Sequence, residues 1–217
     1  MRRLRLYDYA ASANCYKVRL LLATLGLTYE RVPVDIFAGE TLTDDFYLKN
    51  QARSTPVLEV GDGAYLQESN AILTYLADAT ALLPKNAFER AHVLKWLIIE
   101  QTDVIPTMGG LRFRILTGRL SPEDPEARRR HEGGKVTLAM LDAHLDGRRF
   151  FVGQSYSIAD IGLYGYVHVA HEGGIDMGPY RHVRRWLRGV EGQPGFMNDL
   201  EPYPANARPG AGRSTYD

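Results

Sequence analysis

The chain has one cysteine, Cys15, among its 217 residues. A single cysteine cannot form a disulfide within the chain, so nothing in the sequence calls for an oxidising compartment. The sequence also lacks a long uncharged apolar run, and its opening, MRRLRLYDYAA, has neither the apolar stretch nor the cleavage site of a secretory signal. We therefore expect a cytoplasmic protein without a transmembrane helix.

Neither sign of charge is in excess. The 26 basic and 26 acidic residues cancel, which removes the positive footprint typical of proteins that bind nucleic acids or anionic membranes. We expect no partner of either kind. The chain is 45% hydrophobic and 24% charged, which is enough apolar residue content for a buried core in one or two globular domains.

The first 80 residues alternate between strand and helix patterns. The patterns predict strands over 4–9, 28–34, 55–60 and 64–67, helices over 14–26 and 68–78, and a less regular stretch over 35–50. Because a helix separates the first two strands, they should pair in parallel. The Gly-Asp-Gly turn at 61–63 should join the last two as a hairpin.

Strand alternation is absent beyond Pro84, where we place a domain boundary. Helices are predicted over 88–120, 125–145, 157–169, 180–190 and 194–200. Pro106 and the pair Gly109-Gly110 should bend the first of them, and Ser157 with Asp160 forms a capping box. The expected organisation is an α/β domain over 1–80, an all-α domain over 87–203 and an irregular tail over 204–217.

This order of elements resembles the glutathione transferase superfamily, in which a thioredoxin-like domain (β-α-β-α-β-β-α) precedes a helical bundle. The segment YAASANCYKVRLLL resembles the family's first loop and helix, NQARSTPVLE its cis-proline strand, and LQESNAILTYL its Glu-Ser turn. SIADIGLYGY resembles the capping box of its buried helix. The resemblance reaches to about residue 203 and implies a homodimeric detoxification enzyme that uses glutathione as co-substrate and no metal.

Glutathione has two carboxylates, an ammonium and a thiol, and the chain offers a group for each. Ser69 opens a helix, so its hydroxyl and the free N–H groups there suit the α-carboxylate, while Glu68 suits the α-ammonium. The resemblance implies a cis Thr55-Pro56 bond, with the Thr55 backbone pairing with the cysteinyl amide. It also implies an Arg53 contact to the glycine carboxylate. The alternatives are a plain helix cap for Ser69 and a solvated surface position for Arg53.

The loop before Arg53 departs from the common Asn-Pro-x-Gly form of the family, since residues 50–53 read Asn-Gln-Ala-Arg. The family resemblance therefore does not predict the shape of this loop.

The thiol needs a donor that favours its charged form. An unperturbed thiol has a pKa of about 8.5, and one hydrogen bond to a charged acceptor supplies about 1.5–3 kcal/mol. Ser12 matches the catalytic serine of theta- and delta-like members, and Asn14 matches an asparagine of nu-like bacterial members. Both are candidate catalytic residues. Tyr9 remains a weaker alternative.

Cys15 shares helical spacing with Val18, Leu22 and Leu25, which predicts that its side chain faces the core. Buried cysteines of this kind act as small hydrophobic residues. We interpret Cys15 as structural.

The second substrate has no motif of its own. Tyr9, Met108, Arg112 and Phe113 are candidate linings of its pocket, and Gln101 and Asp103 fall where helices of the family meet across a dimer. The hypothesis is a glutathione transferase that activates the thiol for attack on a small electrophile. The alternatives are a glutathione-dependent disulfide reductase or peroxidase and, from another class, a non-catalytic glutathione-binding or assembly module.

Overall fold

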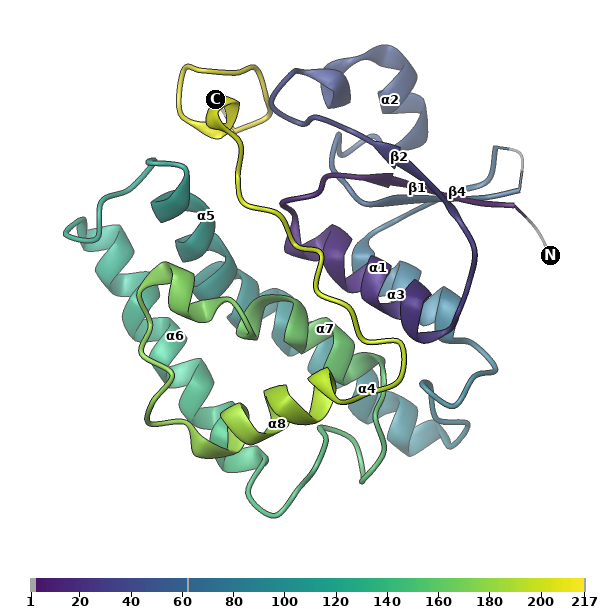
Figure 1. Cartoon of the computed structure of the whole chain (residues 1–217), viewed down its shortest axis with the longest axis vertical. Coiled ribbons are helices and arrows are strands. Elements are labelled where there is room, and N and C mark those ends of the chain that lie inside the picture. The colour runs from purple at the N-terminus through teal and green to yellow at the C-terminus, as the bar shows by residue number, and fades with distance from the viewer. Residues whose placement is uncertain (1–2, 62, 217) are drawn as a thin grey trace. The chain divides into compact units, whose positions relative to one another are not determined.

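The computed structural model describes residues 3–61 and 63–216 (Figure 1). The chain forms two compact units, Met1–Leu76 together with Met197–Asp217, and Ala77–Phe196. Residues 197–203, which the sequence assigned to the helical domain, thus group with the first unit. No helix in the described part of the chain has the length and apolar character needed to span a membrane.

The first unit contains a sheet of four strands in the order β2-β1-β3-β4. The strands are β1 (Leu4–Asp8), β2 (Glu30–Pro33), β3 (Val57–Val60) and β4 (Tyr65–Gln67). β1 pairs with β2 in parallel and with β3 antiparallel, and β3 and β4 are antiparallel. The predicted parallel pair and hairpin are both confirmed, although residue 62 of the hairpin turn lies outside the described residues.

Three helices flank this sheet. α1 (Ala13–Thr24) and α3 (Ser69–Ala77) lie on one side of it and α2 (Asp44–Lys49) lies on the other (Figure 1). α2 follows a 3-10 turn, Glu40–Leu42, and begins where the Thr43 hydroxyl accepts from the Phe46 N–H at 3.2 Å. The stretch 35–50 is therefore more regular than predicted, because a local cap of this kind starts even a short helix.

α1 has the inward face that its apolar spacing predicted. Cys15, Val18 and Leu22 are fully buried. Leu25 is only partly buried because it is the C-cap residue, after which Gly26, with φ of 61°, ends the helix as predicted.

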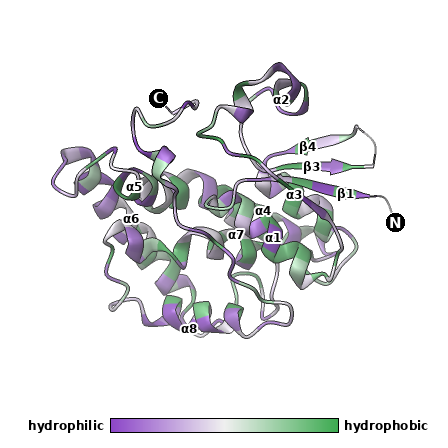
Figure 2. Ribbon diagram, turned by 45° about the horizontal axis from the view of Figure 1, so that its top comes forward, coloured by the Kyte–Doolittle hydropathy of each residue, from purple (hydrophilic) through white to green (hydrophobic). Residues whose placement is uncertain are grey.

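The second unit is all-helical. Its elements are α4 (Ala87–Ile99), a π-helical segment (Glu100–Gly109), α5 (Gly110–Leu116), α6 (Pro125–His144), α7 (Ile158–Val167), a 3-10 turn (Ala170–Gly173) and α8 (Arg181–Glu191). α8 shows alternating polar and apolar bands (Figure 2), because Val183, Trp186 and Val190 are buried while its four arginines are exposed.

Two helix predictions are wrong. The helix expected over 88–120 is three segments, and its middle is a π-helix that contains Pro106, a residue with no N–H to donate. Gly109 is required there because a Cβ atom would lie 2.7 Å from the Tyr166 ring. The helix expected over 194–200 does not form, because Gly195 adopts a left-handed turn with φ of 74°.

The predicted capping box of α7 is present and is buried. Asp160 accepts from the Ser157 N–H at 3.0 Å, and also from the Phe151 N–H and the Trp186 indole N–H. The same carboxylate therefore starts α7 and ties two other segments of the unit to it.

The C-terminal segment packs on the first unit. The buried Arg19 guanidinium contacts Asp199 at 2.9 Å, and the Asn206 side chain donates to Asp35 at 2.8 Å. Arg213 N–H donates to the Phe37 carbonyl at 2.8 Å, and a short 3-10 turn spans Ala205–Ala207. These contacts hold residues 199–213 against α1 and the loop that follows β2.

Candidate active site

Ser12 is held at the start of α1. It is the N-cap residue, its hydroxyl accepts from the Cys15 N–H at 3.3 Å, and its own N–H donates to the Tyr9 carbonyl at 3.0 Å. The loop that links β1 to α1 is thus closed by backbone and side chain together. A hydroxyl so placed sits at the positive end of the helix, where a negative charge is favoured.

Cys15 lies directly behind this loop. Its side chain is fully buried, and its Sγ accepts from the Tyr9 N–H at 3.4 Å. Burial, with the nearby Asp8 carboxylate, raises the pKa of the Cys15 thiol to about 12, outweighing the lowering effect of Thr55, Tyr9 and Ser12. The predicted burial is confirmed, and a thiol in this state is a poor nucleophile at neutral pH.

Asn14 and Ser69 meet although they are far apart in the sequence. The Ser69 hydroxyl donates to the Asn14 side-chain oxygen at 3.2 Å. Ser69 is almost fully buried, and no acceptor contacts the Asn14 side-chain amide nitrogen in the described part of the chain. The structure therefore places Asn14, a residue predicted to donate to the glutathione thiol, beside the pocket predicted for the α-carboxylate. The side-chain N–H groups of Asn14 are available to a ligand.

The start of α3 has the geometry of an anion site. Glu68 is exposed and has a left-handed backbone with φ of 65°, and its carbonyl accepts from the Ile72 N–H at 2.9 Å. Ser69 is the first residue of the helix. The first N–H groups of a helix have no partner within it, so those of α3 point out beside the Ser69 hydroxyl.

The Thr55-Pro56 peptide bond is cis, as the resemblance implied. The loop before it is closed although it lacks the common Asn-Pro-x-Gly form. The Asn50 side chain donates to the Ser54 carbonyl at 2.8 Å and accepts from the Ala52 N–H at 3.0 Å.

Arg53 has several partners within its own domain. Its guanidinium donates to the carbonyls of Thr41 and Thr43 at 3.2 and 3.1 Å and lies 5.0 Å from the centre of the Tyr47 ring. It therefore braces the segment that leads into α2. Its contact to a glycine carboxylate stays a prediction.

The candidate residues for the second substrate fall in both units. Tyr9 belongs to the first, and Met108, Arg112 and Phe113 belong to the second. Met108 and Arg112 are almost fully buried, and Arg112 Nε donates to Glu172 at 2.5 Å. Phe113 is partly buried.

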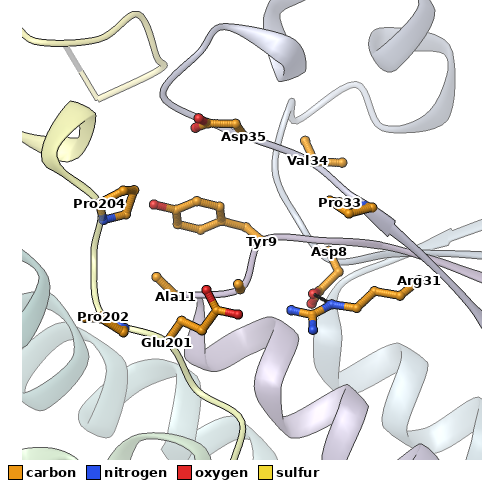
Figure 3. Close-up of a pocket in the computed structure, with 11 residues that line it drawn as sticks. Asp8, Tyr9, Ala11, Arg31, Pro33, Val34, Asp35, Glu201, Pro202 and Pro204 are labelled. Carbon is orange, nitrogen blue, oxygen red and sulfur yellow. Dashed lines mark hydrogen bonds and ion pairs between the residues drawn. The ribbon is translucent and has the colours of Figure 1, made fainter.

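A pocket of about 400 Å³ in the first unit was only partly foreseen (Figure 3). Among its lining residues, the sequence predicts only Tyr9. The other lining residues come from the ends of β1 and β2 and from the tail, and they are Asp8, Ala10, Ala11, Arg31, Pro33, Val34, Asp35, Glu201, Pro202 and Pro204. No local motif marks them, because the pocket exists only where the tail crosses the two strands.

An ion network lies beside this pocket, with Asp8 and Arg19 fully buried and Arg31 and Asp199 partly exposed. The two Asp8 carboxylate oxygens accept from Arg19 and Arg31, each at 2.5 Å, and Arg19 also contacts Asp199 at 2.9 Å. Two carboxylates and two guanidiniums balance in charge. The network thus joins β1, α1, β2 and the tail without a net charge.

A thioredoxin-like domain with a cis-proline loop, a polar helix start facing the first loop, and an all-helical second domain together define the class of this protein. Comparisons with known proteins agree. Residues 2–78 match the model of the glutathione S-transferase N-terminal domain, and residues 104–194 match that of the C-terminal domain. The chain belongs to the glutathione S-transferase family of enzymes.

Individual relatives cover most of the chain. A glutathione S-transferase structure from Pseudomonas fluorescens is 40% identical, with a TM-score of 0.88 over 91% of this chain and 99% of that one. A glutathione transferase structure from Pseudomonas putida, with one glutathione disulfide bound per subunit, is 27% identical with a TM-score of 0.82, over 92% and 91%. A maleylacetoacetate isomerase from Rhizobium meliloti is 33% identical over 79% of this chain and 84% of its own length.

Proposed function

We propose that this protein binds glutathione, lowers the pKa of its thiol with Ser12 assisted by Asn14, and directs the thiolate at a small electrophile. One observation carries the proposal, the hydrogen bond from Ser69 to Asn14. It joins the residue proposed to hold the α-carboxylate to a residue proposed to stabilise the thiolate. One bound tripeptide would therefore contact both.

The binding part of the proposal assigns a residue to each end of glutathione. Ser69 and the free N–H groups of α3 hold the α-carboxylate, and Glu68 holds the α-ammonium. The Thr55 backbone, beside the cis bond to Pro56, pairs with the cysteinyl amide. Arg53 contacts the glycine carboxylate while it keeps its bonds to the segment before α2.

The activation part assigns the thiol to the start of α1. The Ser12 hydroxyl accepts from Cys15 N–H and has a proton to donate to a bound thiolate, which the helix terminus also favours. The free N–H groups of Asn14 are a second donor. Cys15 itself is buried, with its pKa raised, which supports the view that the reactive thiol belongs to glutathione.

The runner-up is a glutathione-dependent disulfide reductase or peroxidase, in which Asn14 is the main donor and the second substrate is a disulfide or peroxide. The observation that supports it is the Pseudomonas putida relative, which was solved with glutathione disulfide. A non-catalytic binding or assembly module is less well supported, because the chain has all of the polar residues proposed for binding and activating glutathione. They are Ser12, Thr55, Glu68 and Ser69. We further propose a cytoplasmic homodimer, for which the exposed Gln101 and Asp103 are candidate contacts.

The test is a titration of thiolate absorbance in the glutathione complex. The pKa of the thiol in the complex should lie well below the ordinary value of about 8.5. Ser12→Ala should raise this pKa and lower the rate of conjugation to an aryl halide, while the affinity for glutathione changes little. Asn86→Ala, which removes the N-cap of α4, is the matched control for the loss of a cap. If Ser12→Ala changes neither the thiol pKa nor the rate, and Asn14→Ala abolishes both the lowering of the pKa and the activity, the reductase function becomes the better description.

A further inference from the structure

The pocket between the strand ends and the tail has a polar group on its wall that the protein leaves unused. Tyr9 is 6% exposed, and its hydroxyl oxygen is buried without a hydrogen-bond partner among the described residues. Its ring packs edge-on against Phe37, with 5.9 Å between ring centres. Figure 3 shows the ring extending from β1 toward Pro204 of the tail. Buried hydroxyls nearly always have a partner, so an unpartnered one beside a pocket points to a ligand.

The Tyr9 hydroxyl is a neutral donor. Burial raises its pKa well above the ordinary value of a tyrosine, and the negative charge of Asp35 adds to the effect. A phenol that keeps its proton donates to an uncharged acceptor such as a carbonyl or nitro oxygen.

The charges around the pocket do not favour an anion. Asp8 and Arg31 belong to the balanced ion network, so they offer no free positive charge. Asp35 accepts from neutral donors only, the N–H groups of Phe37 and Ala38 and the Asn206 side-chain amide. The Glu201 carboxylate has no ion pair or hydrogen bond in the described part of the chain, and Figure 3 shows it extending from the tail toward β1. Two carboxylates thus remain uncompensated at the wall.

The rest of the wall is apolar. Pro33 and Val34 face the pocket from the end of β2, and Pro202 and Pro204 from the tail. These side chains suit the hydrocarbon body of a small molecule and offer no donor for a carboxylate.

We infer that this pocket selects uncharged electrophiles that carry a hydrogen-bond acceptor for Tyr9, and that it rejects carboxylates. The inference rests on the proposed function, because the pocket is lined by Ala10 and Ala11, which directly precede the proposed activator Ser12. It also sets this chain apart from a carboxylate substrate such as the maleylacetoacetate for which the Rhizobium meliloti relative is named.

The experiment measures binding of three probes of similar shape by ligand-observed NMR, without glutathione. Acetophenone has the acceptor, ethylbenzene lacks it, and benzoate carries a charge. Acetophenone should bind most tightly, and benzoate should bind about tenfold or more weakly than acetophenone. Tyr9→Phe should weaken acetophenone about three- to tenfold and leave ethylbenzene unchanged.

Matched variants separate the pocket from general effects. Tyr7→Phe removes a buried hydroxyl that donates to Glu59 outside the pocket, and it should change no probe. Glu201→Gln should improve benzoate binding, whereas Glu123→Gln, at an exposed position in the other unit, should not.

Benzoate binding as tight as that of acetophenone, or acetophenone binding that is the same in wild type and Tyr9→Phe, would overturn the inference. Titration calorimetry on the same proteins measures glutathione binding and tests the proposed function independently of the probes. Absence of glutathione binding by the wild type would contradict the proposed function and leave the comparison of probes interpretable.

Discussion

The Ser69 hydroxyl donates to the Asn14 side-chain oxygen at 3.2 Å, which links the first helix of the α/β domain to its third across 55 positions of sequence. A bond of this kind couples two parts of a ligand site, because each residue positions the other. Its effect should therefore be visible in binding as well as in geometry.

We expect Asn14→Ala and Ser69→Ala each to weaken glutathione binding, and the double variant to show a coupling energy of about 0.5–3 kcal/mol. Titration calorimetry on the four proteins of the cycle measures it. Thr74→Ala, which removes an exposed hydroxyl bonded within α3, pairs with Asn14→Ala as the control cycle and should be additive. Strict additivity of Asn14 and Ser69 would show that the bond does not organise the site.

The anchoring of the tail should appear in stability. Asp199→Asn removes an ionic partner from Arg19, whose side chain is fully buried, and should lower the free energy of unfolding by about 1.5–3 kcal/mol. Urea denaturation measures the change. Asp45→Asn breaks an ion pair with Lys49 in which the aspartate is exposed, so it should cost under about 1 kcal/mol. Equal effects of the two variants would remove the special role of the buried network.

Asp160 should make stability depend on pH in a direction opposite to that of most carboxylates. Burial raises the pKa of Asp160 from 3.8 to about 6, so the native state holds the proton more tightly than the unfolded state. Its contribution to the free energy of unfolding is complete below pH 3.8 and is lost as pH rises through about 6. Two pKa units correspond to about 3 kcal/mol.

Urea denaturation of wild type and Asp160→Asn between pH 4 and pH 7 isolates this contribution, since the other groups cancel in the difference. The stability advantage of the wild type should shrink by about 2.4 kcal/mol over that range, because a small part of it is already lost at pH 4. An advantage that stays constant, or that grows with pH, would mean that the four hydrogen bonds to this carboxylate outweigh its burial.

Cys15 should be inert in the folded protein. Its thiol is fully buried and its pKa is raised to about 12, so an aromatic disulfide reagent at pH 8 should react only as fast as the chain unfolds. Cys15→Ala should cost roughly 0.5–3 kcal/mol of stability through a small cavity and leave the turnover of folded protein nearly unchanged. Rapid labelling of native protein, or loss of activity with normal folding, would instead make Cys15 the nucleophile.

Local signals in the sequence determined most of the first domain. Gly26 ends α1 because only a left-handed residue continues the chain there, and the start of α7 is determined by the capping pair Ser157 and Asp160. The parallel and antiparallel pairings followed from the spacing between strands. The cis Thr55-Pro56 bond followed from family resemblance, and no physical rule applied to those two residues alone predicts it.

Only the tertiary structure decided where the tail lies and what it builds. Arg19 and Asp199 are 180 positions apart, and nothing near either residue indicates that they pair. The pocket beside Tyr9 likewise depends on residues 201–204 crossing the ends of two strands. Caps, turns and periodicity act over a few residues and are therefore legible in sequence, whereas the burial of a charge or a hydroxyl depends on which distant segments come to cover it.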